Sequence, residues 1–209
     1  PTYLRRVRSS ASFCAGLTQG ETNYFYLSSE GAHPNQSQKN TSRAQRLNRE
    51  FHFLTAHETI PGHHLLDARR RSLANPVRRQ LESPLFYEGW ATYAETLLRE
   101  YGYLQGQKHV FLEEKRRLWR AARCLIDVRR HTGQYDRERA AQLLTLAGFS
   151  RTEALTQVDR FQLNPGYQIC YTGGLLELQR LKSTWAPRLG EDRFHELTLS
   201  LGELPFDHL

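Results

Sequence analysis

The stretch His57-Glu58-Thr59-Ile60-Pro61-Gly62-His63-His64, followed by Glu88-Gly89-Trp90-Ala91, decides how this chain is interpreted. It sets three imidazoles and two carboxylates within sequence that is otherwise typical of helices. Two neutral imidazoles, a third ligand from a later helix and a carboxylate beside the first His are the ligand chemistry of a zinc hydrolase. The spacing differs from the common H-E-x-x-H motif, because two extra residues separate Glu58 from the next His.

The helix breakers inside this stretch bear directly on the altered spacing. On a regular helix, His63 would lie about 240° around the axis from His57, and His64 would lie about 10 Å further along it. Proline at position 61 removes the N–H that would bond the carbonyl of His57, and Gly62 permits an unusual turn. We therefore expect the helix to break here, so that His63 turns back beside His57. His64 is expected to be a residue behind the ligands or an ordinary core histidine.

Glu88 is the candidate for the third ligand. Its carboxylate also fits a second interpretation, an interaction with the positive end of a helix dipole. Gly89 and Ala91 are small enough to let another helix approach closely. Glu95 lies one heptad further and shares the face of Glu88, so we expect it to orient a ligand.

Size and composition indicate a globular protein of one domain or two small ones, and the helical period described below predicts a mainly α class. The chain has 209 residues, of which 39% are hydrophobic and 24% charged, and its formal charge is +7. No apolar run approaches the roughly 20 residues needed to span a bilayer. Arginines recur along the whole chain, which favours ion-paired helix faces over a nucleic-acid-binding surface. The three cysteines lie far apart, which excludes a cysteine-rich zinc finger.

The helical period begins near residue 41. Residues 1–40 are expected to be irregular, with a short strand at 23–27, and residues 41–209 to form a helical domain. In the first helix, Ala44, Leu47, Phe51, Leu54 and Glu58 form the expected inward stripe, with Thr41 or Ser42 as the cap. Ser150 and Glu153 have the spacing of a capping box. Further helices are expected at about residues 85–101, 104–131, 135–147, 167–185 and 191–201, and a short connection between Asn75-Pro76 and Ser83-Pro84.

These motifs resemble those of the bacterial family called "domain of unknown function 885", which is grouped with gluzincin-like metallopeptidases. The resemblance covers roughly residues 20–209 and includes further motifs in the same order. These are Arg123 with Asp127 and His131, Asn164-Pro165-Gly166 with Tyr171, Phe194-His195, and Gly202-x-Leu204-Pro205. The segment Gly166-Tyr167-Gln168-Ile169-Cys170 departs from the small residues usual after that glycine.

The resemblance implies a mostly helical, zincin-like catalytic domain that is the C-terminal part of a longer architecture. The wider clan has Gly-His at the end of its own motif, which gives the second-ligand role to His63 and, by a similar interval, the third to Glu88. The chain begins with Pro1 and contains no methionine, so we expect a truncated or processed product. Bacterial cytoplasm and periplasm both remain open.

The resulting hypothesis is a zinc-dependent peptidase in which His57, His63 and Glu88 hold Zn²⁺. Glu58 is expected to act as general base on water activated by the metal, and Tyr171 or His131 to stabilise the oxyanion. Asp127 is expected to orient His131 or to pair with Arg123 or Arg130. The expected substrate is a peptide or another small amide. Two alternatives stay open: a catalytically degenerate helical binding module, and a metal-dependent hydrolase of non-peptide amides or esters.

Overall fold

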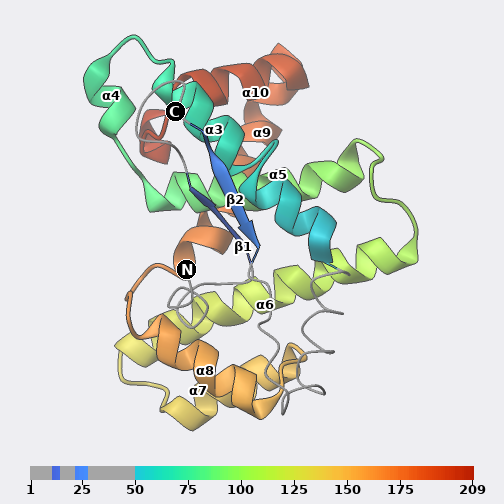
Figure 1. Ribbon diagram of the computed structural model, residues 1–209, viewed down its shortest axis with the longest axis vertical. Helices are drawn as coiled ribbons and strands as arrows, with labels where there is room; N and C mark the ends of the chain where they lie inside the picture. Colours follow the sequence, from blue (N-terminus) through green and yellow to red (C-terminus); the bar gives the residue numbers. More distant parts are fainter. Residues whose placement is uncertain (1–10, 15–21, 28–49) are drawn as a thin grey trace.

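Helices make up most of the structure, a computed structural model that describes residues 11–14, 22–27 and 50–209. A helix runs through residues 50–58, and the strands β1 (Ala11–Cys14) and β2 (Tyr24–Leu27) pair antiparallel. The expected caps Thr41 and Ser42 lie outside the described residues. The labelled helices of Figure 1 are α3 (His63–Arg71), α4 (Pro76–Gln80), α5 (Pro84–Glu100), α6 (Gln107–His131), α7 (Arg137–Leu146), α8 (Arg151–Phe161), α9 (Ile169–Leu189) and α10 (Glu191–Ser200), and a single 3-10 turn, η1, covers Phe206–His208. The mainly α class expected from the sequence is confirmed.

The helix α5 lies at the centre of the main core. Its side chains Phe86, Trp90 and Tyr93 are almost fully buried, together with Leu178 of α9 and Phe194 of α10. A second core joins α6 to the pair α7 and α8, which lie together at the end of the molecule away from α4 and α10 (Figure 1). The two cores are joined where α9 of the first packs against α6 of the second, and the candidate site lies beside the first core.

Local capping chemistry explains where several helices begin. Asn75 and Ser83 are N-caps whose side chains accept backbone N–H bonds, and each is followed by proline at the first helical position. The connection expected between them therefore contains the short helix α4. The capping box predicted at Ser150 and Glu153 is confirmed, with both reciprocal hydrogen bonds present.

The inward stripe predicted for the helix at 50–58 is wrong at Phe51, while Leu54 and Glu58 are half-buried and Ala44 and Leu47 lie outside the described residues. Phe51 is 42% exposed, whereas Phe53, Ala56 and His57 are buried. Both sets fit the helical period, so periodicity could not choose between them. The choice follows from packing, since Phe53 clusters with Leu104 and Leu112 and this rotates His57 toward the interior.

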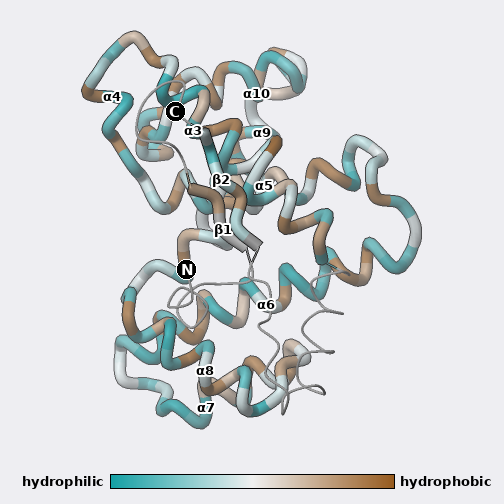
Figure 2. The backbone as a smooth tube through the Cα atoms, viewed as in Figure 1, coloured by the Kyte–Doolittle hydropathy of each residue, from teal (hydrophilic) through white to brown (hydrophobic). Residues whose placement is uncertain are grey.

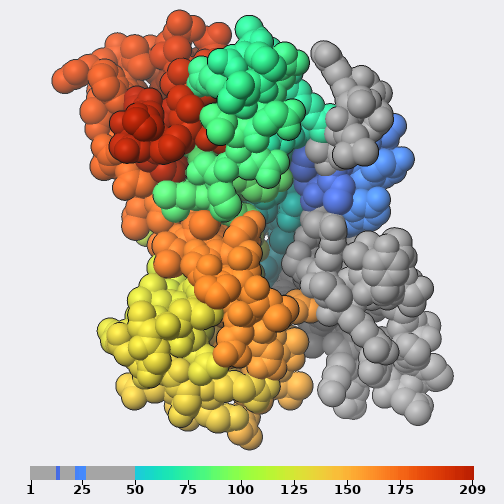
Figure 3. Space-filling model, turned by 90° about the vertical axis from the view of Figure 1, so that its left-hand side faces the viewer, coloured from blue at the N-terminus to red at the C-terminus, as the bar shows by residue number. Residues whose placement is uncertain are grey.

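Hydrophobic and hydrophilic residues are interspersed along most helices (Figure 2), whereas residues 88–95 of α5 are all buried. Within the described part of the chain, no helix is long and apolar enough to cross a membrane. The two strands lie at the surface beside the segment of residues 50–80 (Figure 3).

Candidate metal centre

A tight turn at residues 59–62 sets the positions of both histidines. The preceding helix ends at Glu58, α3 starts at His63, and the Ile60–Pro61 peptide bond is cis. Gly62 has a negative φ of −77°, so it is required for space: a Cβ there would overlap the carbonyl oxygens of Ala56 and His57. The indole Nε1 of Trp90 donates to the carbonyl of Pro61 at 2.8 Å, which ties the turn to α5. The expected helix break is confirmed, and it brings the imidazole of His63 next to that of His57.

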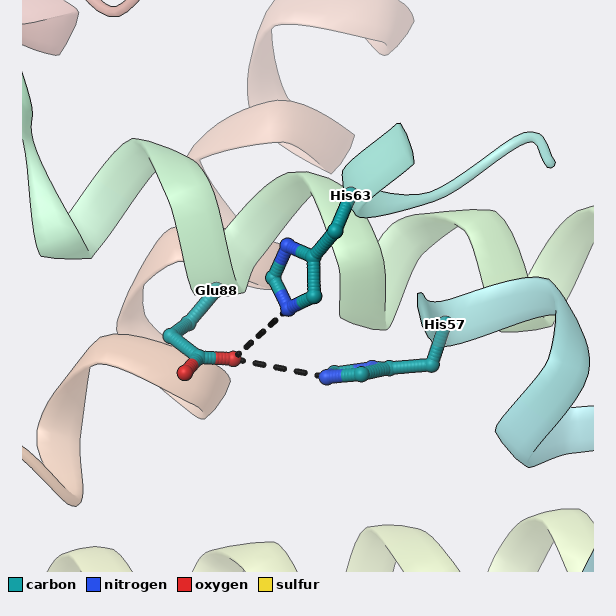
Figure 4. A group of neighbouring side chains, drawn as sticks. All are labelled: His57, His63 and Glu88. Atoms are coloured by element: carbon teal, nitrogen blue, oxygen red, sulfur yellow. Dashed lines mark ion pairs between the residues drawn. The ribbon is translucent and has the colours of Figure 1, made fainter. Parts of the chain in front are cut away.

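Three side chains from three elements converge beside this turn (Figure 4). His57 Nε2 lies 3.4 Å from Glu88 Oε2, and His63 Nε2 lies 3.6 Å from the same oxygen. One ligand atom from each residue falls within 4.8 Å of the others, and all three residues are buried. The structure therefore brings together the three residues that the sequence suggested as metal ligands.

The polar atoms of this cluster fit a bound cation. Glu88 Oε2 and His63 Nδ1 are buried, and neither has a hydrogen-bond partner among the described residues. A buried polar atom without a partner costs about 1–3 kcal/mol, more for a charged group. An ion held by two imidazole nitrogens and one carboxylate oxygen would remove that cost at Glu88, and this donor set suits zinc.

A buried charge network lies behind His57. Its Nδ1 is 2.9 Å from Glu95 Oε1, as the heptad spacing predicted. Glu95 in turn accepts hydrogen bonds from Arg116 and Arg120, at 2.8 and 2.9 Å to its Oε2. Both arginines are ion-paired, as expected from the sequence, but their burial was not predicted. This network fixes the orientation of the imidazole so that Nε2 faces Glu88.

The same burial and pairing shift the ionisation of the cluster. Burial opposes charge on His57, but ion pairs with Glu88 and Glu95 raise its pKa to about 9. Burial lowers the pKa of His63, and the neighbouring His57 adds to that shift. Burial opposes charge on Glu88 as well, yet its two histidine partners hold its pKa well below the usual range. Glu88 is therefore an ionised carboxylate, the form that binds a cation.

Three tyrosines surround the cluster. The ring of Tyr87 stacks on His63 with 3.8 Å between centroids, and the ring of Tyr171 stacks on His57 at 6.3 Å. The hydroxyl of Tyr167 donates to Glu88 Oε1 at 2.6 Å. Sequence reasoning selected only Tyr171 of the three. The other two could have been suspected from the sequence. Tyr87 directly precedes Glu88, and Tyr167 lies in the segment that departs from the family pattern.

Glu58 and His64 face the strands. Glu58 Oε2 accepts the backbone N–H of Phe13 in β1 at 2.8 Å. Asn23 Nδ2 lies 3.1 Å from His64 Nε2, and the ring of Phe13 is 5.4 Å from the imidazole of His64. The negative charge of Glu58 reaches His63, where it favours the protonated form and so raises the pKa against the larger effect of burial. Glu58 therefore lies near the cluster, and His64 is turned away from it.

His131 lies at the last turn of α6. Its Nδ1 is 2.7 Å from Asp127 Oδ1, so Asp127 pairs with His131. It is not part of the group of ligand atoms formed by His57, His63 and Glu88. The C-terminal motif is also engaged elsewhere, since His195 Nε2 and the hydroxyl of Tyr93 form a hydrogen bond of 2.6 Å.

Comparison with known proteins gives a family and a fold. The sequence profile of the family described as "Bacterial protein of unknown function (DUF885)" matches residues 1–209. Among curated proteins, none matches the chain. Among the solved structures that resemble it are two described as a "putative lipoprotein". The one from Colwellia psychrerythraea has a TM-score of 0.82 at 22% identity, and the one from Shewanella oneidensis, described as of unknown function, has 0.81 at 24%.

These similarities cover nearly all of this chain and a minor part of the relatives. The alignments include 99% and 96% of this chain, but 35% of the Colwellia protein and 38% of the Shewanella protein. The chain thus spans little more than a third of the length of either solved structure.

Proposed function

Because the chain belongs to the bacterial family DUF885, whose function is unknown, we propose its function from the chemistry of the site: a zinc-dependent hydrolase acting on peptides or other small amides. The observation that carries the proposal is the buried convergence of His57, His63 and Glu88 on one point, with Glu88 Oε2 lacking a hydrogen-bond partner among the described residues. A gluzincin-like catalytic arrangement is part of this proposal. Its support is a third ligand that comes from the next long helix.

The residues around the cluster have distinct parts in this proposal. Zinc, when bound by His57, His63 and Glu88, supplies a Lewis acid that acidifies water and polarises a carbonyl. Glu58 takes a proton from the attacking water and passes it to the leaving amine. Glu58 Oε2 accepts the backbone N–H of Phe13 in the structure, so the transfer requires this hydrogen bond to open or the other carboxylate oxygen to act. Glu95 keeps the Nε2 atom of His57 aimed at the metal.

Tyr171 is the candidate for stabilising the oxyanion. Its ring lies against His57, and the guanidinium of Arg123 lies 4.0 Å above it, so the side chain is held firmly. Burial raises the pKa of its hydroxyl, which stays protonated and able to donate. One such donor is commonly worth about 3–4 kcal/mol of barrier. The position of His131, paired with Asp127, makes it the weaker candidate.

Metal content and cleavage test the proposal together. We expect about one zinc per purified chain, and loss of most of it in His57→Ala and Glu88→Ala. Glu58→Gln should retain zinc and lose cleavage of a fluorogenic peptide library by about 100-fold or more, because the base is removed and the ligands stay. The Arg151→Gln variant, with its exposed ion pair to Glu138, is the matched control and should keep both properties.

Three outcomes separate this function from its alternatives. Absence of zinc from the wild-type chain and from the zinc-dialysed protein would exclude it. Zinc binding without cleavage of any amide or ester would indicate the helical binding module. Cleavage of esters or non-peptide amides alone, lost in Glu58→Gln, would keep the mechanism and change the substrate.

A further inference from the structure

The two oxygens of the Glu88 carboxylate have different surroundings. Oε2 faces the Nε2 atoms of His57 and His63, at 3.4 and 3.6 Å. Oε1 accepts the hydroxyl of Tyr167 at 2.6 Å, a short hydrogen bond to a charged acceptor. A tyrosine hydroxyl ordinarily keeps its proton near neutral pH, and a carboxylate oxygen can only accept, so this group acts as the donor. The carboxylate therefore has one oxygen turned to the cluster and one already engaged.

Tyr167 is held in place by the residues on either side of it. The carboxylate of Asp127, which is 1% exposed, accepts the backbone N–H groups of Gly166 at 3.0 Å and Gln168 at 2.8 Å. Arg123 donates from Nε to the side-chain oxygen of Gln168 at 2.8 Å, with a second bond from its Nη2. The backbone of Tyr167 thus lies between two anchored neighbours.

Both anchors come from one face of α6. Arg123 and Asp127 are four residues apart, so their side chains lie one helical turn from each other. Both residues are buried, and the Arg123 guanidinium also covers the ring of Tyr171. Hence α6, which supplies no ligand, fixes the loop 164–168 that reaches Glu88.

We propose that Tyr167 is a positioning residue for the metal ligand Glu88, and that α6 holds it there through Asp127 and Arg123. This inference rests on the proposed metal site. With Oε1 bonded to a hydroxyl, the carboxylate binds the ion through Oε2 alone. A carboxylate that bound through both oxygens would occupy a coordination position that a catalytic site must leave open for water or substrate.

The test compares Tyr167→Phe with Tyr101→Phe. Each change removes one hydroxyl that donates to a carboxylate, but Tyr101 bonds to Glu191 at 3.0 Å on the exposed surface. We expect Tyr167→Phe to weaken zinc affinity by about 10- to 100-fold in competition with a chelator. We also expect the visible spectrum of its Co²⁺ form to lose intensity, because a higher coordination number absorbs less. Tyr101→Phe should match the wild type in both measurements.

A second variant distinguishes a loss of positioning from a loss of folding. Asp127→Asn keeps the shape of the side chain but weakens its hydrogen bonds to the N–H groups of Gly166 and Gln168. We therefore expect the Co²⁺ spectrum of this variant to lose intensity as well. Circular dichroism of the metal-free proteins should be unchanged. Wild-type zinc affinity and Co²⁺ spectrum in Tyr167→Phe would overturn the positioning role and leave the proposed function standing. Failure of the wild-type chain to bind either ion would overturn both.

Discussion

His63 and His64 are neighbours in the chain but belong to different parts of the molecule. The imidazole of His63 lies 3.6 Å from Glu88, whereas that of His64 contacts Asn23 and Phe13 in the strand region. We expect His63→Ala to lose zinc, and His64→Ala to keep it while amide hydrogens of β1 and β2 exchange faster. Metal analysis and hydrogen exchange measure the two effects. Zinc loss in His64→Ala with retention in His63→Ala would reverse the assignment.

At the residue scale, the sequence predicted those side chains whose type and spacing reflect one local motif. His57 and His63 fall in this class, whereas Glu88 was suggested with the help of the interval that the resemblance implies, and Glu95 by its heptad relation to Glu88. It could not predict Arg116 and Arg120 as partners of Glu95, since arginines on a long helix usually extend into solvent. Their burial follows from the packing of α6 beside α5, which local sequence does not contain. Tyr167 was missed for the same reason, because its partner comes from a distant helix.

At the element scale, α5 and α9 approach each other backbone to backbone in the main core. A Cβ at Gly174 would overlap the carbonyl oxygen of Leu85 and lie 2.6 Å from the Cα of Gly89. We expect Gly174→Ala to force the helices apart and to lower the free energy of unfolding by about 2–4 kcal/mol, as severe overpacking does. Urea denaturation followed by circular dichroism measures this change.

The adjacent glycine supplies the control for that prediction. At Gly173 the nearest atom to a Cβ is the flexible side-chain end of Leu85, at 3.3 Å. Gly173→Ala should therefore be neutral or stabilise the protein by up to about 1 kcal/mol, because alanine favours a helix. Equal destabilisation by both variants would show that the contact between the helices is not the cause.

Helix limits could be predicted largely from proline and capping residues. The expected helices near residues 85–101, 135–147 and 191–201 match α5, α7 and α10 to within a few residues. The strand at 23–27 also appears, as β2. Its partner β1 was missed, because Ala11-Ser12-Phe13-Cys14 is too short and mixed to show strand periodicity. Pairing with β2 and the hydrogen bond to Glu58 define it in the structure.

At the scale of the whole molecule, the cluster connects three elements through one point. Zinc that binds the folded state should stabilise it by about 2.7 kcal/mol at a free concentration of 100 times Kd. For a chain of this length, that corresponds to a rise in Tm of roughly 5–10 °C. Differential scanning calorimetry with and without a chelator measures it, and His63→Ala should show no rise. An equal rise in that variant would place the stabilising ion elsewhere.

The net charge of the molecule does not describe its surface directly. Although the formal charge is +7, Arg116, Arg120 and Arg123 are buried, and the first two neutralise Glu95 internally. Arg137 and Arg193 form ion pairs at the surface, with Asp159 and Glu196. The arginines therefore form buried ion pairs as well as ion pairs at the surface.

The contact between Gly89 and Gly174 also has a consequence for how such sequences can change over time. The two positions are far apart in the chain but meet backbone to backbone, so neither accepts a side chain while the other stays in place. Substitution at one is tolerated only if the helix that carries the other shifts. Of the two helices, α5 also carries Glu88, so a shift of α5 that made room for a side chain at Gly174 would displace the proposed third ligand.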